Sequence, residues 1–282
     1  VPHRADGSPG ADVVPALELR DITRRFGGIS AVEAVSIAGS PGEIVGLIGQ
    51  NGAGQTTIFD LVCGYQPLDG GRIALAGRDV SRLSPGHRAR LGLGRTFQGG
   101  RLFPGLTVPG SSAVSSGRSL AAPAPLRAAI AAPPHFDSEQ RVGRRVRQLV
   151  ELFGLGDYVD SFTAELSTGT RRIVELACVV GHQPSVLLLD EPAGGVAQRE
   201  VEQLGHLLRR IRDELGCSMV VIEHDMPMIA GLSDRLVALE TGVVIAEGRP
   251  SDVLTDPRVI ASYLGDDHAA VARSGTAPTG GG

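Results

Sequence analysis

A glycine-rich loop at residues 49–57 has the spacing of a phosphate-binding loop. Its sequence, Gly-Gln-Asn-Gly-Ala-Gly-Gln-Thr-Thr, follows the pattern Gly-x-x-x-x-Gly-Lys-[Ser/Thr], except that Gln55 occupies the position of the lysine. Such loops surround nucleotide phosphates with backbone N–H groups, and the lysine adds a positive charge. Nucleotide binding is therefore expected, with one cation missing. The residues expected to bind the nucleotide are Gly49, Gln50, Asn51, Gly52, Ala53, Gly54, Gln55, Thr56 and Thr57.

Two carboxylates, Asp190 and Glu191, directly follow an apolar run at Val186–Leu189. A strand of a parallel sheet would deliver them to the carboxyl edge, where ligands of open α/β sheets bind. There Asp190 would hold Mg²⁺ through water, together with the Thr56 hydroxyl, and Glu191 would act as a general base on an attacking water. An acidic pair after a strand is also a common helix start. Its combination with the loop at 49–57 favours the catalytic interpretation.

Residues 166–170, Leu-Ser-Thr-Gly-Thr, are expected to open a helix. Ser167 is a good N-cap residue, which is the simpler interpretation. The alternative is that the helix N-terminus presents its N–H groups and the Ser167 hydroxyl to a γ-phosphate. Both interpretations bring four candidate residues to one helix end: Ser167, Thr168, Gly169 and Thr170.

The elements that must position these residues can be recognised from short apolar runs. We expect an edge strand at Ala16–Arg20, buried strands at Ile44–Ile48, Val186–Leu189 and Met219–Ile222, and a hairpin of Leu236–Leu239 with Val243–Ala246. Asp69-Gly70-Gly71 indicates a further hairpin turn, before a strand at Arg72–Leu75.

Helical patterns lie between these strands. We expect helices from Gln55 to about Cys63 with Gly64 as the stop, at 198–215, and along a repeat of apolar residues at Val142, Val146, Leu149, Val150 and Phe153 that ends at Gly154. Residues 105–134 are expected to form loop or irregular helix. Strands separated by helices of this length indicate a parallel sheet with helices on both faces.

The composition is that of a globular protein. With 282 residues, of which 42% are hydrophobic and 21% charged, the chain can bury one large core or two small ones. The net charge of −4 argues against a nucleic-acid partner. Three cysteines without Cys-x-x-Cys spacing favour a reducing compartment. No apolar run reaches the roughly 18 residues of a membrane span, and residues 1–15 lack a signal-peptide core.

Together these motifs resemble the ATP-binding cassette (ABC) ATPases, whose signature is Leu-Ser-Gly-Gly-Gln. Residues 166–170 keep its serine and its second glycine. In the order of that family, Phe26 matches the aromatic that stacks on adenine. Gln98 matches the glutamine that links Mg²⁺ and water to a transmembrane partner, and His224 matches the switch histidine that contacts the γ-phosphate. Taken singly, the simpler interpretations are a core aromatic, a surface loop residue and a helix-capping histidine.

The resemblance covers about residues 16–265 and implies an α/β fold. This fold has a P-loop NTPase (RecA-like) core, an antiparallel β subdomain and a helical subdomain at about 99–170. Outside it, residues 1–15 and 266–282 are expected to be a flexible N-terminal segment and a disordered tail, because their composition buries little apolar surface.

Four segments are similar to the branched-chain amino acid importers: Arg25-Phe26-Gly27-Gly28, Gly94-Arg95-Thr96-Phe97-Gln98, Arg101-Leu102-Phe103-Pro104 and Ser262-Tyr263-Leu264-Gly265. That resemblance implies ATP and Mg²⁺ as ligands and a homo- or heterodimer of ATPase subunits with ATP between them. It also implies two transmembrane permeases, an extracytoplasmic solute-binding protein, and a peripheral position at the cytoplasmic face of the membrane.

The chain departs from the family pattern at three places. Gln55 replaces a cation, which predicts weakened ATP binding and severely weakened hydrolysis. Pro109-Gly110-Ser111-Ser112 replaces a polar Glu-Asn helix start, and this is expected to loosen the helix. Gly195-Val196-Ala197 offers no polar side chain to a second subunit.

Several functions remain open from the sequence. The leading one is the ATPase that drives an importer of branched-chain amino acids or a similar small solute. Gln55 favours a hydrolysis-impaired partner subunit, while export of a lipid or polysaccharide shares the same cassette. A cassette protein acting on ribosomes or DNA is disfavoured, because the chain has one cassette and no basic patch.

Overall fold

The fold is built around a six-stranded sheet. The computed structural model describes residues 13–96, 102, 105–117 and 133–263. The sheet has the order β10-β9-β3-β8-β7-β6. Its strands are β3 (Ile44–Gly49), β6 (Leu93–Arg95), β7 (Val186–Asp190), β8 (Ser218–Ile222), β9 (Arg235–Glu240) and β10 (Val243–Gly248). All neighbours are parallel except β9 and β10, which form the expected hairpin.

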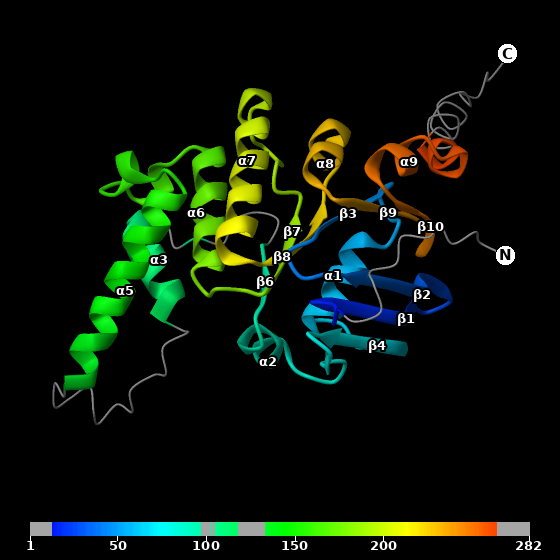
Figure 1. Cartoon of the computed structure of the whole chain (residues 1–282), viewed down its shortest axis with the longest axis horizontal. Helices are drawn as coiled ribbons and strands as arrows, with labels where there is room; N and C mark the ends of the chain where they lie inside the picture. Colours follow the sequence, from blue (N-terminus) through cyan, green and yellow to red (C-terminus); the bar gives the residue numbers. More distant parts are fainter. Residues whose placement is uncertain (1–12, 97–101, 103–104, 118–132, 264–282) are drawn as a thin grey trace, which may run out of the picture.

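A second, antiparallel sheet has the order β2-β1-β4-β5. Its strands are β1 (Leu17–Phe26), β2 (Ile29–Gly39), β4 (Gly70–Leu75) and β5 (Arg78–Asp79). The expected edge strand at Ala16–Arg20 is therefore wrong in position, because β1 pairs with β2 on one side and β4 on the other. Figure 1 shows this sheet at one end of the molecule and the helices α3 and α5 at the other.

The helices join and cover these sheets. They are α1 (Gln55–Cys63), α2 (Pro85–Arg90), α3 (Val108–Gly117), α5 (Pro133–Leu152), α6 (Thr168–Val180), α7 (Gln198–Leu215), α8 (Met226–Leu232) and α9 (Pro250–Leu254). The bounds of α1 and α7 agree with the sequence patterns, and Gly64 ends α1 in the left-handed region at φ 79°. Short 3₁₀ turns lie at Gly156–Tyr158 and Thr163–Glu165.

The two faces of the six-stranded sheet are covered differently. Ile44, Leu187 and Val221 pack toward a cluster with α6, α7 and α8. The alternating residues Val45 and Leu188 pack toward a second cluster, with α1 and the antiparallel sheet. Helices were expected on both faces of the sheet. Helices cover one face, while α1 and the antiparallel sheet together cover the other. The fold therefore places α1, and the loop before it, between the two sheets.

Two local expectations are wrong. Asp69-Gly70-Gly71 is no hairpin turn, since β4 begins at Gly70 and its hairpin to β5 turns at Ala76–Gly77. Gly71 is needed instead for close approach, because a Cβ there would lie 2.4 Å from the Asp21 carbonyl oxygen. Residues 108–117 form the regular helix α3. Pro109 is tolerated because it lies in the first turn, where backbone N–H groups have no partner within the helix and the missing N–H of proline costs nothing. Of the expected loop at 105–134, residues 118–132 lie outside the described part.

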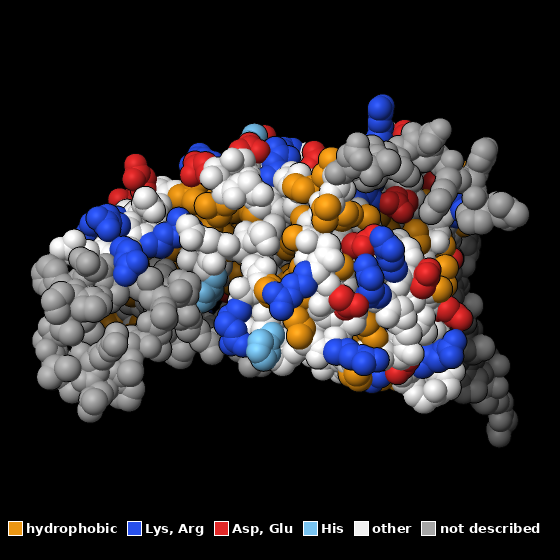
Figure 2. All heavy atoms as spheres, turned by 60° about the horizontal axis from the view of Figure 1, so that its bottom comes forward, with side chains coloured by type: hydrophobic (Ala, Val, Ile, Leu, Met, Phe, Trp, Pro, Cys, Tyr) orange, Lys and Arg blue, Asp and Glu red, His pale blue; other side chains and the backbone are white. Residues whose placement is uncertain are grey.

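The surface in Figure 2 shows acidic and basic side chains interspersed over the antiparallel sheet. Within the described residues, no helix is both long and apolar enough to cross a membrane. The expected flexible segments, 1–15 and 266–282, fall almost wholly outside the described residues.

Candidate functional site

The loop between β3 and α1 has the backbone of a phosphate cradle. Gly54 precedes α1 at φ 103°, and the first turn of α1 has neither a side-chain cap nor an acidic residue. A Cβ at Gly54 would lie 2.5 Å from the Ala31 carbonyl oxygen, and one at Gly49 would lie 2.5 Å from the Leu239 carbonyl oxygen. Gly52, at φ 87°, faces open space. The helix N-terminus is thus open to an anion, which its dipole favours.

Gln55, the first residue of α1, turns its side chain away from solvent. It is 6% exposed, and its Nε2 donates a hydrogen bond to the Leu47 backbone oxygen over 3.0 Å. The next residue, Thr56, is exposed, and Thr57 is half-buried. The loop therefore offers the exposed Thr56 hydroxyl and its backbone N–H groups, while the residue in the position of the lysine is hydrogen-bonded to strand β3.

The C-terminal part of the described chain lies against the same loop. The side-chain amide of Gln50 donates a hydrogen bond to the Ser262 backbone oxygen. Burial raises the pKa of the Tyr263 hydroxyl. The segment 261–263 thus supports the loop from outside. Asn51 is exposed and Ala53 is buried.

Asp190 ends β7 in a buried position beside Arg95. It is 3% exposed, and its Oδ2 accepts a hydrogen bond from Arg95 Nη2 over 3.1 Å. Burial raises the pKa of Asp190, and Arg95 opposes that shift. Among the described residues, the other oxygen, Oδ1, is buried without a hydrogen-bond partner. Since a buried acceptor without a donor is costly, this oxygen suits a cation or a water bound to one.

Glu191 and His224 meet beside Asp190. The Glu191 Oε1 lies 3.3 Å from His224 Nε2, and both side chains are partly exposed. Glu191 has φ 47°, a left-handed conformation that is strained for a residue with a Cβ. Its backbone N–H donates to the Ile222 oxygen at 2.9 Å, which ties the turn to β8. The predicted base and switch histidine are therefore neighbours.

Glu223 organises the two loops that carry this pair, a role that the sequence analysis missed. Its Oε2 accepts a hydrogen bond from the Ala193 N–H at 3.0 Å, and its Oε1 accepts from the His224 N–H at 2.9 Å. The residue is 5% exposed. A carboxylate directly after an apolar strand was a usable signal, because a buried acid needs donors nearby.

Arg95 was also missed. It ends β6 and contacts Asp190 on β7 as well as Asp60 on α1, where Nη1 and Oδ1 lie 2.6 Å apart. The available signal was an arginine at the end of an apolar run, which indicates a buried guanidinium. Such a group requires a carboxylate partner.

The helix end at 167–170 has the geometry of an N-cap. Ser167 Oγ accepts from the Thr170 backbone N–H at 3.1 Å, and it also lies 2.9 Å from Thr170 Oγ1. Thr168 and Gly169 lie in the first turn of α6. The capping interpretation is thus observed, and the second interpretation, contact with a γ-phosphate, stays a prediction.

Phe26 ends β1 and is 45% exposed, so it is not a core aromatic. The Arg24 guanidinium carbon lies 4.7 Å from the centre of its ring, a cation–π distance. Gln98 lies outside the described residues. The remaining predicted residues thus form three groups. The first is the loop at 49–57 with Asp190, Glu191 and His224 at the edge of the six-stranded sheet. The second is the N-terminal end of α6, and the third is Phe26 on the antiparallel sheet.

Residues 32–194 match the ABC transporter family. Residues 243–269 match a second family, described as branched-chain amino acid ATP-binding cassette transporter. These two matches include the loop, the acidic pair and the segment that packs against the loop.

Several relatives are similar over most of the chain. The high-affinity branched-chain amino acid transport ATP-binding protein BraF of Pseudomonas aeruginosa is 34% identical, over 89% of this chain and 98% of its own. LivG of Escherichia coli, which has the same description, is 35% identical with the same coverage. The lipopolysaccharide export ATP-binding protein LptB of Escherichia coli is 33% identical, over 89% and 98%.

A solved structure agrees in fold. The ADP conformation of an ATP-binding cassette from an ABC transporter has a TM-score of 0.76 and 27% identity, and the match covers 89% of this chain and 99% of that one. A nucleotide-free cassette gives a TM-score of 0.75 and 26% identity.

Proposed function

The chain belongs to the ABC transporter family, and from that premise we propose that it is the ATP-binding subunit of an importer for branched-chain amino acids. The C-terminal match at 243–269 supports this choice, because that family is described by these solutes. BraF and LivG are named for the same transport. LptB, named for lipopolysaccharide export, is almost as similar over the matched 89% of the chain, so overall identity does not separate import from export. The C-terminal match is what favours import.

The arrangement of the site supports ATP as the ligand. The loop at 49–57 would hold the phosphates with backbone N–H groups, and Phe26 would stack on adenine. His224 would contact the γ-phosphate, and Glu191, 3.3 Å from it, would accept a proton from the attacking water. Thr56 and Asp190, with Gln98, would hold Mg²⁺. Bound Mg²⁺ neutralises charge on the phosphate oxygens.

A second cassette would complete the site. The first turn of α6, where the N–H groups of Thr168 and Gly169 lie beside the N-cap Ser167, suits a γ-phosphate carried by a partner subunit, so Ser167, Thr168, Gly169 and Thr170 would contact ATP across a dimer. The helical segment at about 99–170 would face two membrane permeases, and these would receive solute from an extracytoplasmic binding protein. In this arrangement the chain would lie at the cytoplasmic face of the membrane, as a peripheral homo- or heterodimer subunit.

The contact between Gln55 and Leu47 carries the proposal about turnover. A neutral amide held by the backbone of β3 adds no positive charge beside the phosphates. Replacing a charge-assisted hydrogen bond by a neutral one costs on the order of 1–2 kcal/mol in the bound state. The transition state gathers more charge, so the same loss is larger there. We therefore propose a subunit that binds ATP and hydrolyses it slowly, beside an intact partner cassette.

Three measurements test the assignment. Isothermal titration of the purified protein with ATP is expected to show binding, and co-purification is expected to recover a second cassette subunit. Uptake of labelled leucine, isoleucine and valine is then compared in cells with and without the gene. Uptake that is unchanged for all three solutes would contradict the importer assignment, while absence of ATP binding would contradict the nucleotide site itself.

A further inference from the structure

We propose that Arg95 is a positioning residue for the divalent cation. It holds the Asp190 carboxylate by one oxygen and leaves the other for the metal or its water. This inference rests on the proposed ATP- and Mg²⁺-binding function and concerns a residue to which neither the motifs nor the family resemblance assigned a role.

Arg95 is fixed from several directions. Its side chain is 7% exposed, and Nη2 lies 3.1 Å from Asp190 Oδ2 while Nη1 lies 2.6 Å from Asp60 Oδ1. The guanidinium carbon lies 5.5 Å from the centre of the Phe59 ring. A planar fork held between two carboxylates and an aromatic ring has little freedom to rotate, so it can define the orientation of a neighbouring carboxylate.

The effect on Asp190 is selective between its two oxygens. Oδ2 is taken by Arg95, and the backbone N–H of Asp190 is held by Thr96 Oγ1 at 3.2 Å. Oδ1 is buried and, within the described residues, has no hydrogen-bond partner. A carboxylate so restrained directs a single oxygen toward a ligand. An oxygen atom of a carboxylate is the kind of ligand that Mg²⁺ prefers, directly or through water.

The position of Arg95 also connects this carboxylate to the phosphate loop. Asp60 lies on α1, the helix whose N-terminus forms the loop, and Asp190 lies at the end of β7. Arg95 could alternatively serve only to fasten α1 to the sheet. If Arg95 only fastens α1, substitution of Asp60 should weaken metal binding as much as substitution of Arg95. If Arg95 positions Asp190, substitution of Arg95 should weaken metal binding more than substitution of Asp60.

Binding of Mn²⁺ in the presence of ADP, measured by electron paramagnetic resonance of the free ion, separates these accounts. Arg95→Lys keeps the charge but cannot bridge two carboxylates, and we expect Mn²⁺ affinity to fall about tenfold, as for other outer-shell ligand partners. Metal-free ADP affinity is expected to remain unchanged. Asp60→Asn leaves the Asp190 contact in place, so a clearly smaller loss is expected.

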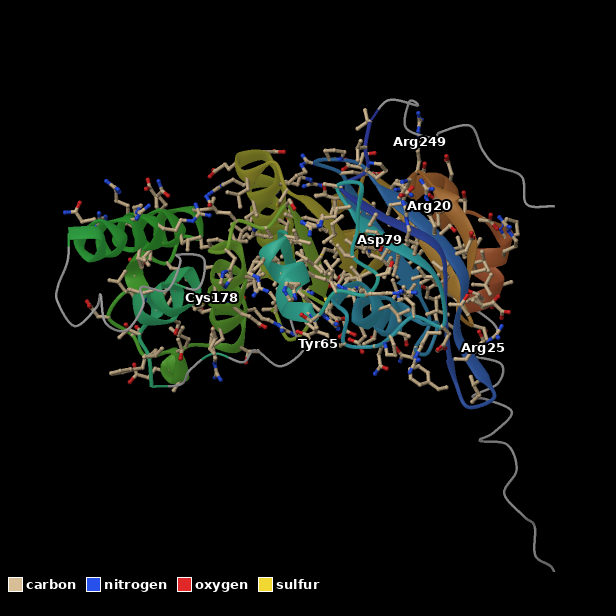
Figure 3. The ribbon with its side chains drawn as sticks, turned by 90° about the horizontal axis from the view of Figure 1, so that it is seen from below. Arg20, Arg25, Tyr65, Asp79, Cys178 and Arg249 are labelled. Carbon is tan, nitrogen blue, oxygen red and sulfur yellow. The ribbon has the colours of Figure 1, made fainter. Side chains whose placement is uncertain are left out.

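Two further variants complete the design. The double variant Arg95→Gln/Asp60→Asn removes one positive and one negative charge, and it is expected to lose Mn²⁺ affinity as Arg95→Lys does. If Arg95→Lys does not fold, as judged by circular dichroism, the comparison of this double variant with Asp60→Asn decides. Arg20→Lys makes the same exchange on the exposed face of β1 (Figure 3), where Arg20 pairs with Glu18, and should leave Mn²⁺ affinity unchanged.

The outcomes that overturn the proposal are distinct. Wild-type Mn²⁺ affinity in both Arg95 variants, or an equal loss in Asp60→Asn, overturns the positioning role and leaves the proposed function standing. Failure of the unaltered protein to bind ADP without metal overturns the proposed function, and the inference with it.

Discussion

The side-chain amide of Gln55 donates a hydrogen bond to the backbone oxygen of Leu47 over 3.0 Å, inside the protein. This bond joins Gln55, which lies in the loop at 49–57 and is the first residue of α1, to Leu47 in β3, before the loop. A hydrogen bond of this kind stabilises the fold by about 1 kcal/mol. The loop therefore keeps its shape without a lysine, and under the proposed function we expect phosphate binding to be separable from hydrolysis.

The conformation of Glu191 predicts a conflict between stability and catalysis. At φ 47° any residue with a Cβ is strained, while glycine is not. Glu191→Gly and Glu191→Ala both remove the carboxylate, yet we expect the glycine variant to be more stable by about 1 kcal/mol. Urea unfolding followed by circular dichroism measures the difference. An alanine variant as stable as the glycine variant would show that the turn relaxes.

Arg88 predicts a large structural effect away from the site. It is 2% exposed and donates hydrogen bonds to the backbone oxygens of Leu61 and Val62 at the end of α1, as well as to Ser81 and Leu83. Arg88→Met removes this donor from all four oxygens, of which Leu61 keeps the Gly64 N–H, so we expect a loss of about 3 kcal/mol in the free energy of unfolding.

Arg90→Met serves as the matched control for Arg88, since Arg90 is an exposed residue of the same helix. We expect it to change urea stability by less than about 0.5 kcal/mol. Equal effects of the two substitutions would mean that the side chain of Arg88 does not support the end of α1.

The buried cysteines predict the behaviour of the protein at high pH. Burial raises the pKa of the Cys63 and Cys217 thiols from 9.0 to about 11. Below pH 9 both folded and unfolded thiols are protonated, so these groups leave stability unaffected. Between pH 9 and 11 the unfolded thiols lose their protons first, and stability therefore falls as the pH rises.

Alkylation measures the same property directly. At pH 8 we expect iodoacetamide to modify Cys63 and Cys217 far more slowly in the native protein than in urea, because both are buried and few thiolates form. Mass spectrometry identifies the modified residue. The half-buried Cys178, in the α6 region of Figure 3, provides the internal comparison. Native alkylation of Cys63 at the unfolded rate would contradict the raised pKa.

Much of the fold follows from local patterns in the sequence. The helix at Gln55–Cys63, its stop at Gly64 and the β9–β10 hairpin were all predicted, because caps and apolar periodicity act over a few residues. The place of β1 within its sheet was not, since it depends on pairing with β4, some 50 residues away. Gly71 serves the same pairing and was mistaken for a turn residue.

The site divides in the same way. The loop and the carboxylates at the end of β7 were recognisable, because their residue types and spacing match a known nucleotide-binding pattern. The partners of Arg95 and Glu223 were not, since Asp60, Asp190 and Ala193 reach them only in the folded chain. Nor does the sequence reveal that the amide of Gln55 is held by Leu47, a contact that depends on how the strand enters the loop.

The account is tested most directly by comparing ATP hydrolysis in the unaltered protein and in Gln55→Lys, with ATP affinity measured in parallel. We expect the lysine variant to bind ATP about tenfold more tightly and to raise kcat by a larger factor, because the transition state carries more charge than bound ATP. Isothermal titration gives the affinity, and steady-state phosphate release gives kcat. Equal rates of hydrolysis in the two proteins would contradict the claim that Gln55 limits turnover.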